Sequence, residues 1–127
     1  MTYSPLTENL ILTSFVLKSM SEVIRYNYLY RDSGNYKKFG SKRYGNPDQL
    51  PFEEIEQNIL KNLIDQVYFY PDHVGIKKFK FHRYWDCYSW YEFESIEILD
   101  NTNLSTKKLE SISNLILNLH NMKYLNS

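Results

Sequence analysis

The sequence has few of the residues that build covalent or flexible frameworks. Its 127 residues include one cysteine, four glycines and four prolines. The single Cys87 has no partner for an internal disulfide, and no Cys/His spacing predicts structural zinc. We find no internal repeat, low-complexity tract or linker. The chain therefore predicts one domain, stabilised by its own core, in a reducing compartment.

Net charge and long apolar runs are also missing. Fifteen basic and fifteen acidic residues cancel, so no overall field draws the protein onto nucleic acid or a membrane. An apolar tract at residues 10–17 is ended by Lys18, well short of the roughly twenty residues of a membrane span. No basic residue precedes that tract, as a signal peptide would require. We therefore expect a cytoplasmic protein without membrane contact.

Aromatic residues are abundant instead, and many of them fall within residues 22–44. Apolar and polar residues alternate from Ile24 to Arg31, which is the period of a half-buried strand. Asp32–Asn35 is a run of turn-forming residues, and Tyr36–Tyr44 resumes as a second strand with Gly40 as a candidate bulge. This stretch predicts a β-hairpin.

Apolar residues spaced by three and four predict three helices. The first covers about residues 5–20, after Ser4 as its cap. The second begins at Pro51 and continues to about Val67, with acids in its first turn that suit the helix dipole. The third covers 104–123, and Ser105 is its expected cap.

Two further strands are expected after the second helix. Residues 76–84 alternate and predict the first of them, following a turn or single helical turn at 71–75. Residues 85–89 form the connecting loop, and 90–99 form the last strand. The apolar side of that strand changes parity near Glu94 and Ser95, which predicts a bulge there.

The expected order is helix, strand, strand, helix, strand, strand, helix. This order favours an α+β two-layer sandwich, with a roughly four-stranded, mainly antiparallel sheet and the helices packed on one face. We interpret residues 1–127 as a single domain. It consists of an added N-terminal helix (1–20), a central unit (21–100) and a C-terminal helix (104–123).

The hairpin combines basic residues with tyrosines and contains Asp32 as the acid of its turn. This combination fits phosphate contact with base stacking, or an acidic protein surface. Alternatively, the lysines pair with acids of a neighbouring strand. A second aromatic cluster, which includes Trp85, Trp90 and Tyr91, is either core or a partner-binding surface. The predicted ligand- or partner-binding residues are Tyr28, Tyr30, Arg31, Asp32, Asn35, Tyr36, Lys37, Lys38, Lys42, Arg43, Trp85 and Trp90.

The candidates for catalysis are few. Asp32 at a strand end invites comparison with magnesium-dependent nucleases, but an Asp that starts a tight turn usually accepts backbone N–H groups. His82 has no partner that the sequence fixes, and the acid beside Cys87 would raise the pKa of its thiol, which makes it a poor nucleophile. We expect no catalytic residue, metal or cofactor. The alternative is a small metal-dependent nuclease or nucleotide-acting enzyme that uses Asp32, His82 and Glu92.

Four segments resemble a family of small, mostly uncharacterised bacterial proteins. The resemblance covers residues 21 to about 98 and includes a YRD-x-GNYK hairpin, an LSLEEIE-like helix start and a WHEF-like last strand. The matching segments are 30–37 (YRDSGNYK), 46–56 (NPDQLPFEEIE), 63–76 (LIDQVYFYPDHVGI) and 90–97 (WYEFESIE). The resemblance implies no assigned activity. Pro51 and Tyr91 stand where the family pattern has a capping Ser and a His, so a site built on such histidines is not expected here.

These observations lead to one functional expectation. We expect a small non-enzymatic binding protein that uses the hairpin to engage a protein partner or an anionic, nucleotide-like ligand, with nucleic acid not favoured. The two terminal helices are expected to support self-association into a homo-oligomer. The resemblance to small bacterial proteins favours a role in bacterial conflict, as a toxin component or in phage defence or its inhibition.

Overall fold

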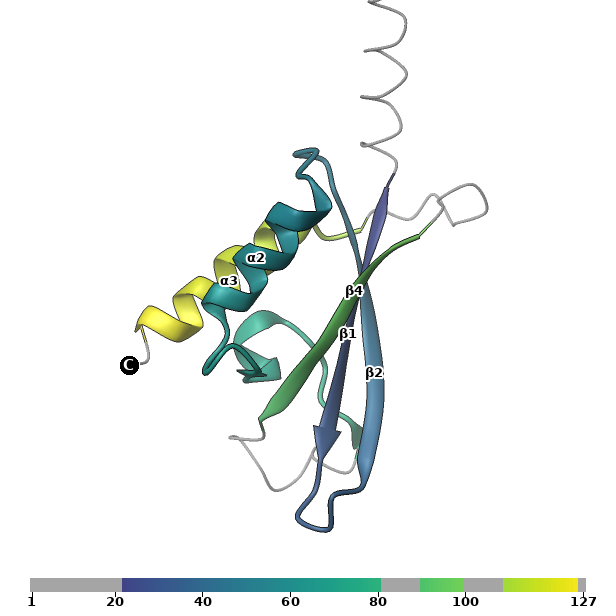
Figure 1. The fold of residues 1–127 in the computed structure, drawn as a ribbon, viewed down its shortest axis with the longest axis vertical. Helices are drawn as coiled ribbons and strands as arrows, with labels where there is room; N and C mark the ends of the chain where they lie inside the picture. Colours follow the sequence, from purple (N-terminus) through teal and green to yellow (C-terminus); the bar gives the residue numbers. More distant parts are fainter. Residues whose placement is uncertain (1–21, 81–89, 100–108, 126–127) are drawn as a thin grey trace, which may run out of the picture.

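The computed structural model describes residues 22–80, 90–99 and 109–125, and in these residues the chain has an α+β fold. Four antiparallel strands form one sheet in the order β2-β1-β4-β3. Figure 1 shows helices α2 and α3 on the same side of this sheet. The elements in chain order are β1 (Val23–Arg31), β2 (Lys37–Gly45), α2 (Phe52–Asn62), β3 (Tyr68–Phe69), the 3-10 helix η1 (Pro71–Val74), β4 (Tyr91–Leu99) and α3 (Ile112–Leu125).

The predicted hairpin is confirmed as β1 and β2, which pair without interruption from Val23↔Gly45 to Arg31↔Lys37. The bulge expected at Gly40 is wrong, because Gly40 pairs directly with Tyr28. Gly40 serves a different purpose. A Cβ at this position would lie 2.7 Å from the Tyr28 ring, so only glycine leaves room for that ring.

The bulge predicted near Glu94 and Ser95 in the last strand is confirmed. β1 and β4 pair in register up to Asn27↔Ser95, and the next pair is Tyr28↔Phe93. Glu94 is therefore the extra residue of a β-bulge, which accounts for the change in apolar parity along this strand.

The third predicted strand is wrong in its position. Residues 76–79 form no strand, and residues 81–84 lie outside the described part of the chain. The Phe79 N–H donates to the Tyr91 hydroxyl at 2.8 Å, so this backbone group bonds to a side chain rather than to a neighbouring strand. The strand between α2 and β4 is instead β3, in which Tyr68 pairs with Glu92 and Phe69 pairs with Tyr91. The helical turn expected at 71–75 is confirmed as η1.

Both described helices are shorter than predicted. Helix α2 ends at Asn62, because Leu63 is extended and Asp65 and Gln66 then adopt positive φ of 53° and 61°. Helix α3 begins at Ile112, and its first turn is capped by Ser111 Oγ, which accepts the Ser113 N–H at 3.1 Å. The expected helix at 5–20 and the expected cap Ser105 lie outside the described residues. Neither described helix has the length and apolar character needed to cross a membrane.

The core lies between the sheet and the two helices. The strands contribute mostly aromatic side chains and the helices contribute aliphatic ones. Burying each aliphatic side chain stabilises the fold by about 1.5–3 kcal/mol. The main core residues are Ile24, Tyr26, Tyr28, Tyr44, Phe69, Tyr91 and Ile96 from the strands and Ile55, Ile59, Ile112, Leu115, Leu119 and Met122 from the helices.

Candidate functional site

The basic residues of the hairpin are divided between the two faces of the sheet. Lys38 and Lys42 alternate with Lys37 and Arg43 along β2, so the two pairs lie on opposite faces. Lys42 Nζ reaches Glu110 at 2.9 Å and the Gly75 carbonyl at 3.0 Å, which places it on the helix side. Lys37 and Arg43 therefore belong to the opposite side, which we call the outer face. The basic residues predicted as one patch are thus divided between the two faces of the sheet.

Arginines of β1 pair with acids of the neighbouring strand β4. Arg31 donates to both carboxylate oxygens of Glu92, at 2.9 and 3.3 Å. Arg25 Nε lies 3.7 Å from Glu97 Oε1, and Asn27 Nδ2 donates to the same oxygen at 2.7 Å. The sequence led us to consider lysines as the partners of acids on a neighbouring strand, whereas here Arg25 and Arg31 form such pairs.

Asp32 acts as a turn residue. Its Oδ1 accepts the Tyr36 N–H at 2.9 Å, and its carbonyl accepts the Asn35 N–H at 2.9 Å. Asn35 has a φ of 66°, and its side chain accepts a hydrogen bond from Arg31 at 2.6 Å. These contacts hold Asp32, Asn35 and Arg31 together at the end of the hairpin.

The carboxylates of the alternative enzyme both have structural partners. Asp32 is bonded within its turn, and Glu92 is held by Arg31. His82 lies outside the described residues. Among residues 22–80, 90–99 and 109–125, no three His, Cys, Asp or Glu side chains gather in a way that could hold a metal ion.

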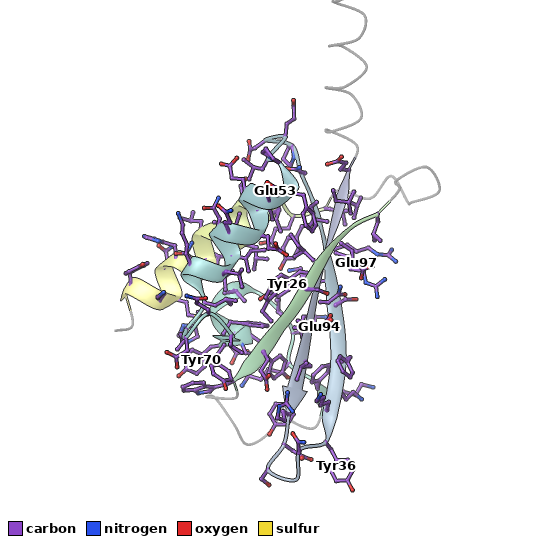
Figure 2. All side chains as sticks on the ribbon, in the orientation of Figure 1. Tyr26, Tyr36, Glu53, Tyr70, Glu94 and Glu97 are labelled. Carbon is purple, nitrogen blue, oxygen red and sulfur yellow. The ribbon has the colours of Figure 1, made fainter. Side chains whose placement is uncertain are left out.

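The predicted aromatic residues have very different surroundings. Tyr28 belongs to the core, where its ring stacks on Tyr91 at 5.9 Å, and the half-buried Tyr30 also contacts Tyr91. Tyr36 at the tip of the hairpin is 79% exposed, and Figure 2 shows it directed away from the sheet. Phe39 is 62% exposed, although the sequence did not single it out. The hairpin register could have indicated this exposure, because it pairs Phe39 with Leu29, which occupies an outer-face position of β1.

The second aromatic cluster is divided between core and surface. Tyr91 is fully buried. Trp90 is 44% exposed and meets Tyr68 and Tyr70 edge-on, at ring distances of 5.4 and 5.3 Å. Trp85 lies outside the described residues. Of the predicted binding residues in this cluster, only Trp90 can be placed, and it lies at the surface beside β3.

A shallow hollow of about 270 Å³ lies on the outer face, where β4, β1 and β2 run side by side. The β4 bulge brings the Glu94 carboxylate into this hollow, where it accepts a hydrogen bond from Ser95 Oγ at 2.7 Å. Figure 2 shows Glu97 on the side of the sheet opposite Tyr26, which faces the helices. The hollow therefore combines cation, acid and aromatic groups. It is lined by Arg25, Asn27, Phe39, Gly40, Ser41, Glu94 and Glu97.

The buried tyrosines keep their hydroxyls neutral. Burial raises the pKa of Tyr91 to about 12, although the hydrogen bond from the Phe79 N–H acts in the opposite direction. Burial also raises the pKa of Tyr26, Tyr28 and Tyr44. The hydroxyls of Tyr26 and Tyr44 are buried, with no hydrogen-bond partner among the described residues. These groups therefore remain protonated at neutral pH and serve as packing residues.

Comparisons of the chain with protein-family models, with curated proteins and with solved structures find no match.

Proposed function

We propose that this protein is a non-enzymatic binding protein whose β1–β2 hairpin engages a protein partner. The observation that carries the proposal is the exposure of two large aromatic side chains on one hairpin, Tyr36 at its tip and Phe39 on its outer face. Lys37 and Arg43 share the outer face with Phe39. Neither base forms an ion pair with another described residue. Exposed aromatic and arginine side chains are typical anchors of protein–protein interfaces.

The distribution of charge favours a protein over an anionic small ligand. A nucleotide-like ligand needs several cations that converge on one point. Here Lys38 and Lys42 lie on the opposite face from Lys37 and Arg43, and the outer-face hollow contains Glu94 and Glu97. A protein surface extends far enough to contact charges dispersed in this way, whereas a single phosphate group reaches the bases of only one face.

The wider setting is part of the same proposal. The resemblance to small bacterial proteins supports a role in bacterial conflict, and the single Cys87 supports the cytoplasm. A two-layer sandwich that begins with a helix at 1–20, and self-association through the terminal helices, also remain proposals. The alternative, a small metal-dependent nuclease, would need His82 to complete a site with Asp32 and Glu92.

Native mass spectrometry of the protein purified from its own host tests the proposal. We expect the wild-type protein to carry a partner polypeptide at fixed stoichiometry and to lose it when Tyr36→Ser and Phe39→Ser are combined. The matched control combines Leu117→Ser and Tyr124→Ser on α3, where both side chains are also about half exposed, at 55% and 54%. This control should retain the partner polypeptide, whatever its effect on self-association through α3.

Three outcomes would overturn the proposal. The first is a complex that survives the hairpin double variant. The second is a retained nucleotide in place of a polypeptide. The third is a protein that arrives free of any partner under gentle conditions.

A further inference from the structure

We propose that the partner binds by adding an extended, acidic segment to the outer edge of β2. The inference rests on the proposed function and names its mode of binding. β2 is an edge strand, because β1 is its only neighbour in the sheet of the described residues. An edge strand presents backbone N–H and C=O groups to which another chain can pair.

Hydrogen bonds at the two ends of β2 show which backbone groups point outward. At the hairpin end, the Tyr36 carbonyl accepts the Asp32 N–H, so the backbone groups of Tyr36 point toward β1. At the other end, the Gly45 N–H donates to the Glu110 carbonyl at 2.8 Å and therefore points away from β1. Along a strand, the backbone N–H and C=O groups of successive residues point alternately toward one neighbouring strand and toward the other side. Both ends lead to the same assignment, in which the outward residues are Lys37, Phe39, Ser41 and Arg43.

The backbone groups of these four outward residues have no backbone partner in the part of the chain that the structure describes. Within the described part of the chain, no backbone hydrogen bond from another segment reaches β2 between Lys37 and Tyr44. The chain itself uses the next outward group, because Gly45 forms an isolated parallel bridge with Ser111. An added strand would continue from this existing contact toward the hairpin tip.

The charge of β2 determines which segment can pair there. Its nine residues include four bases and no acid. A second copy of the chain would place these bases opposite one another, and like charges across a strand pair are destabilising. Edge lysines are a common means of opposing such self-pairing. An acidic segment would instead be attracted by the same side chains.

The outer face indicates the pattern of that segment. Lys37, Phe39 and Arg43 have outward-pointing backbone groups, and their side chains share the outer face. A paired strand would therefore place an apolar residue opposite Phe39 and acids opposite Lys37 and Arg43. The acid opposite Lys37 would lie two residues from the apolar residue. The acid opposite Arg43 would lie four residues from it, on the other side. The partner thus contains an extended segment of this pattern.

Titration of the isotope-labelled 127-residue chain with synthetic peptides, followed by NMR, tests the inference. The probes are two heptapeptides of threonine with glutamate at both ends. One has valine at the third position and the other at the fifth, to allow either strand direction. We expect the amide signals of Phe39 and Ser41, which point outward, to shift more than that of Gly40, which points toward β1. Control peptides with lysine in place of glutamate should cause no such shifts.

Variants separate backbone pairing from charge attraction. Ser41→Pro removes an outward N–H but no bond to β1, and should weaken peptide binding at least about tenfold. Lys37→Glu combined with Arg43→Glu should abolish binding. Lys61→Glu combined with Lys123→Glu makes the same charge change on the helices and should leave binding intact.

Several results would overturn strand addition. These are an absence of shifts with the acidic peptides, equal shifts with the lysine peptides, or unchanged binding by a Ser41→Pro variant whose spectrum remains folded. Any of them would mean that the bases only protect the edge. If the native complex is nevertheless lost in the Tyr36 and Phe39 double variant, the proposed function stands and only the proposed strand addition is wrong. If that complex survives the double variant, the proposed function fails with it.

Discussion

Tyr28 and Gly40 face each other across the β1–β2 pair, and the Tyr28 ring occupies the space that a side chain on Gly40 would need. The ring also stacks on Tyr91 and meets Phe69 edge-on at 6.0 Å. The missing side chain on the edge strand β2 thus allows the ring of Tyr28, on the inner strand β1, to lie over Gly40 while it packs in the core.

We expect Gly40→Ala to lower the free energy of unfolding by about 1–3 kcal/mol, because overpacking forces neighbouring atoms to shift. Urea denaturation measures the change. In a Tyr28→Val background the same Gly40→Ala change should cost less than in the wild-type protein, since the ring that the new methyl group meets is absent. Gly34→Ala is the control. A Cβ at Gly34 would lie 3.3 Å from the nearest atom, which belongs to the exposed ring of Tyr36. Equal stability of the Gly40→Ala and wild-type proteins would contradict this account.

Three buried tyrosines should respond differently to loss of the hydroxyl. Tyr26→Phe and Tyr44→Phe should leave stability unchanged or raise it by about 1 kcal/mol, because each removes a buried polar group without a described partner. Tyr91→Phe should lower it by about 1–2 kcal/mol, because the Phe79 N–H loses its acceptor. Urea midpoints of the three variants provide the comparison, and the reverse ranking would show that this interpretation is wrong.

Stability should fall at alkaline pH. Tyrosines ionise near pH 10 in an unfolded chain, whereas burial raises the pKa of Tyr91 to about 12 and also raises those of Tyr26, Tyr28 and Tyr44. Their stabilisation is complete below about pH 10 and is lost as pH rises toward the folded pKa values, by at most about 1.4 kcal/mol per tyrosine per pH unit.

Urea unfolding between about pH 8 and pH 11 measures this loss, together with tyrosine absorbance. Tyr91→Phe should show a shallower fall than the wild-type protein. Complete ionisation of all tyrosines near pH 10, in a chain that stays folded, would be incompatible with the burial described here.

Asp32 should matter for stability through its hydrogen bond alone. Asp32→Ala removes the acceptor of the Tyr36 N–H and should cost about 1 kcal/mol. Asp32→Asn keeps an acceptor at the same position and should cost much less. Thermal or urea unfolding distinguishes the two variants. Equal losses would indicate that the charge of Asp32, rather than its hydrogen bond, supports the turn.

The sequence predicts the hairpin and the β4 bulge because both leave a local signal. The alternation from Ile24 to Arg31 and the parity change near Glu94 can be read within a few residues. β3 could not be predicted in this way, because Tyr68 and Phe69 are too short a run to show any period. The end of α2 was also missed, because it depends on positive φ at Asp65 and Gln66, and neither residue type demands that conformation.

The candidate site was predicted in composition but not in arrangement. The sequence identifies the bases of the hairpin, yet whether they are paired depends on residues far along the chain. Arg31 meets Glu92 only because the register of β1 against β4 places Leu29 opposite Glu92. Such long-range register is set by core packing on the other face. The exposed Phe39 was overlooked although its position depends only on the local hairpin register, which places it opposite Leu29.

The order of strands in the sheet also determines when each strand can pair during synthesis of the chain. β4 lies between β1 and β3, although it is made last of the four strands. The β1–β2 hairpin is local, and such units form within about 1–10 μs. Arg25 of β1 pairs with Glu97, roughly seventy residues later, and synthesis of that interval takes about 4–14 s. For those seconds β1 has no strand paired to its second edge, and unpaired strand edges of this kind are prone to aggregation.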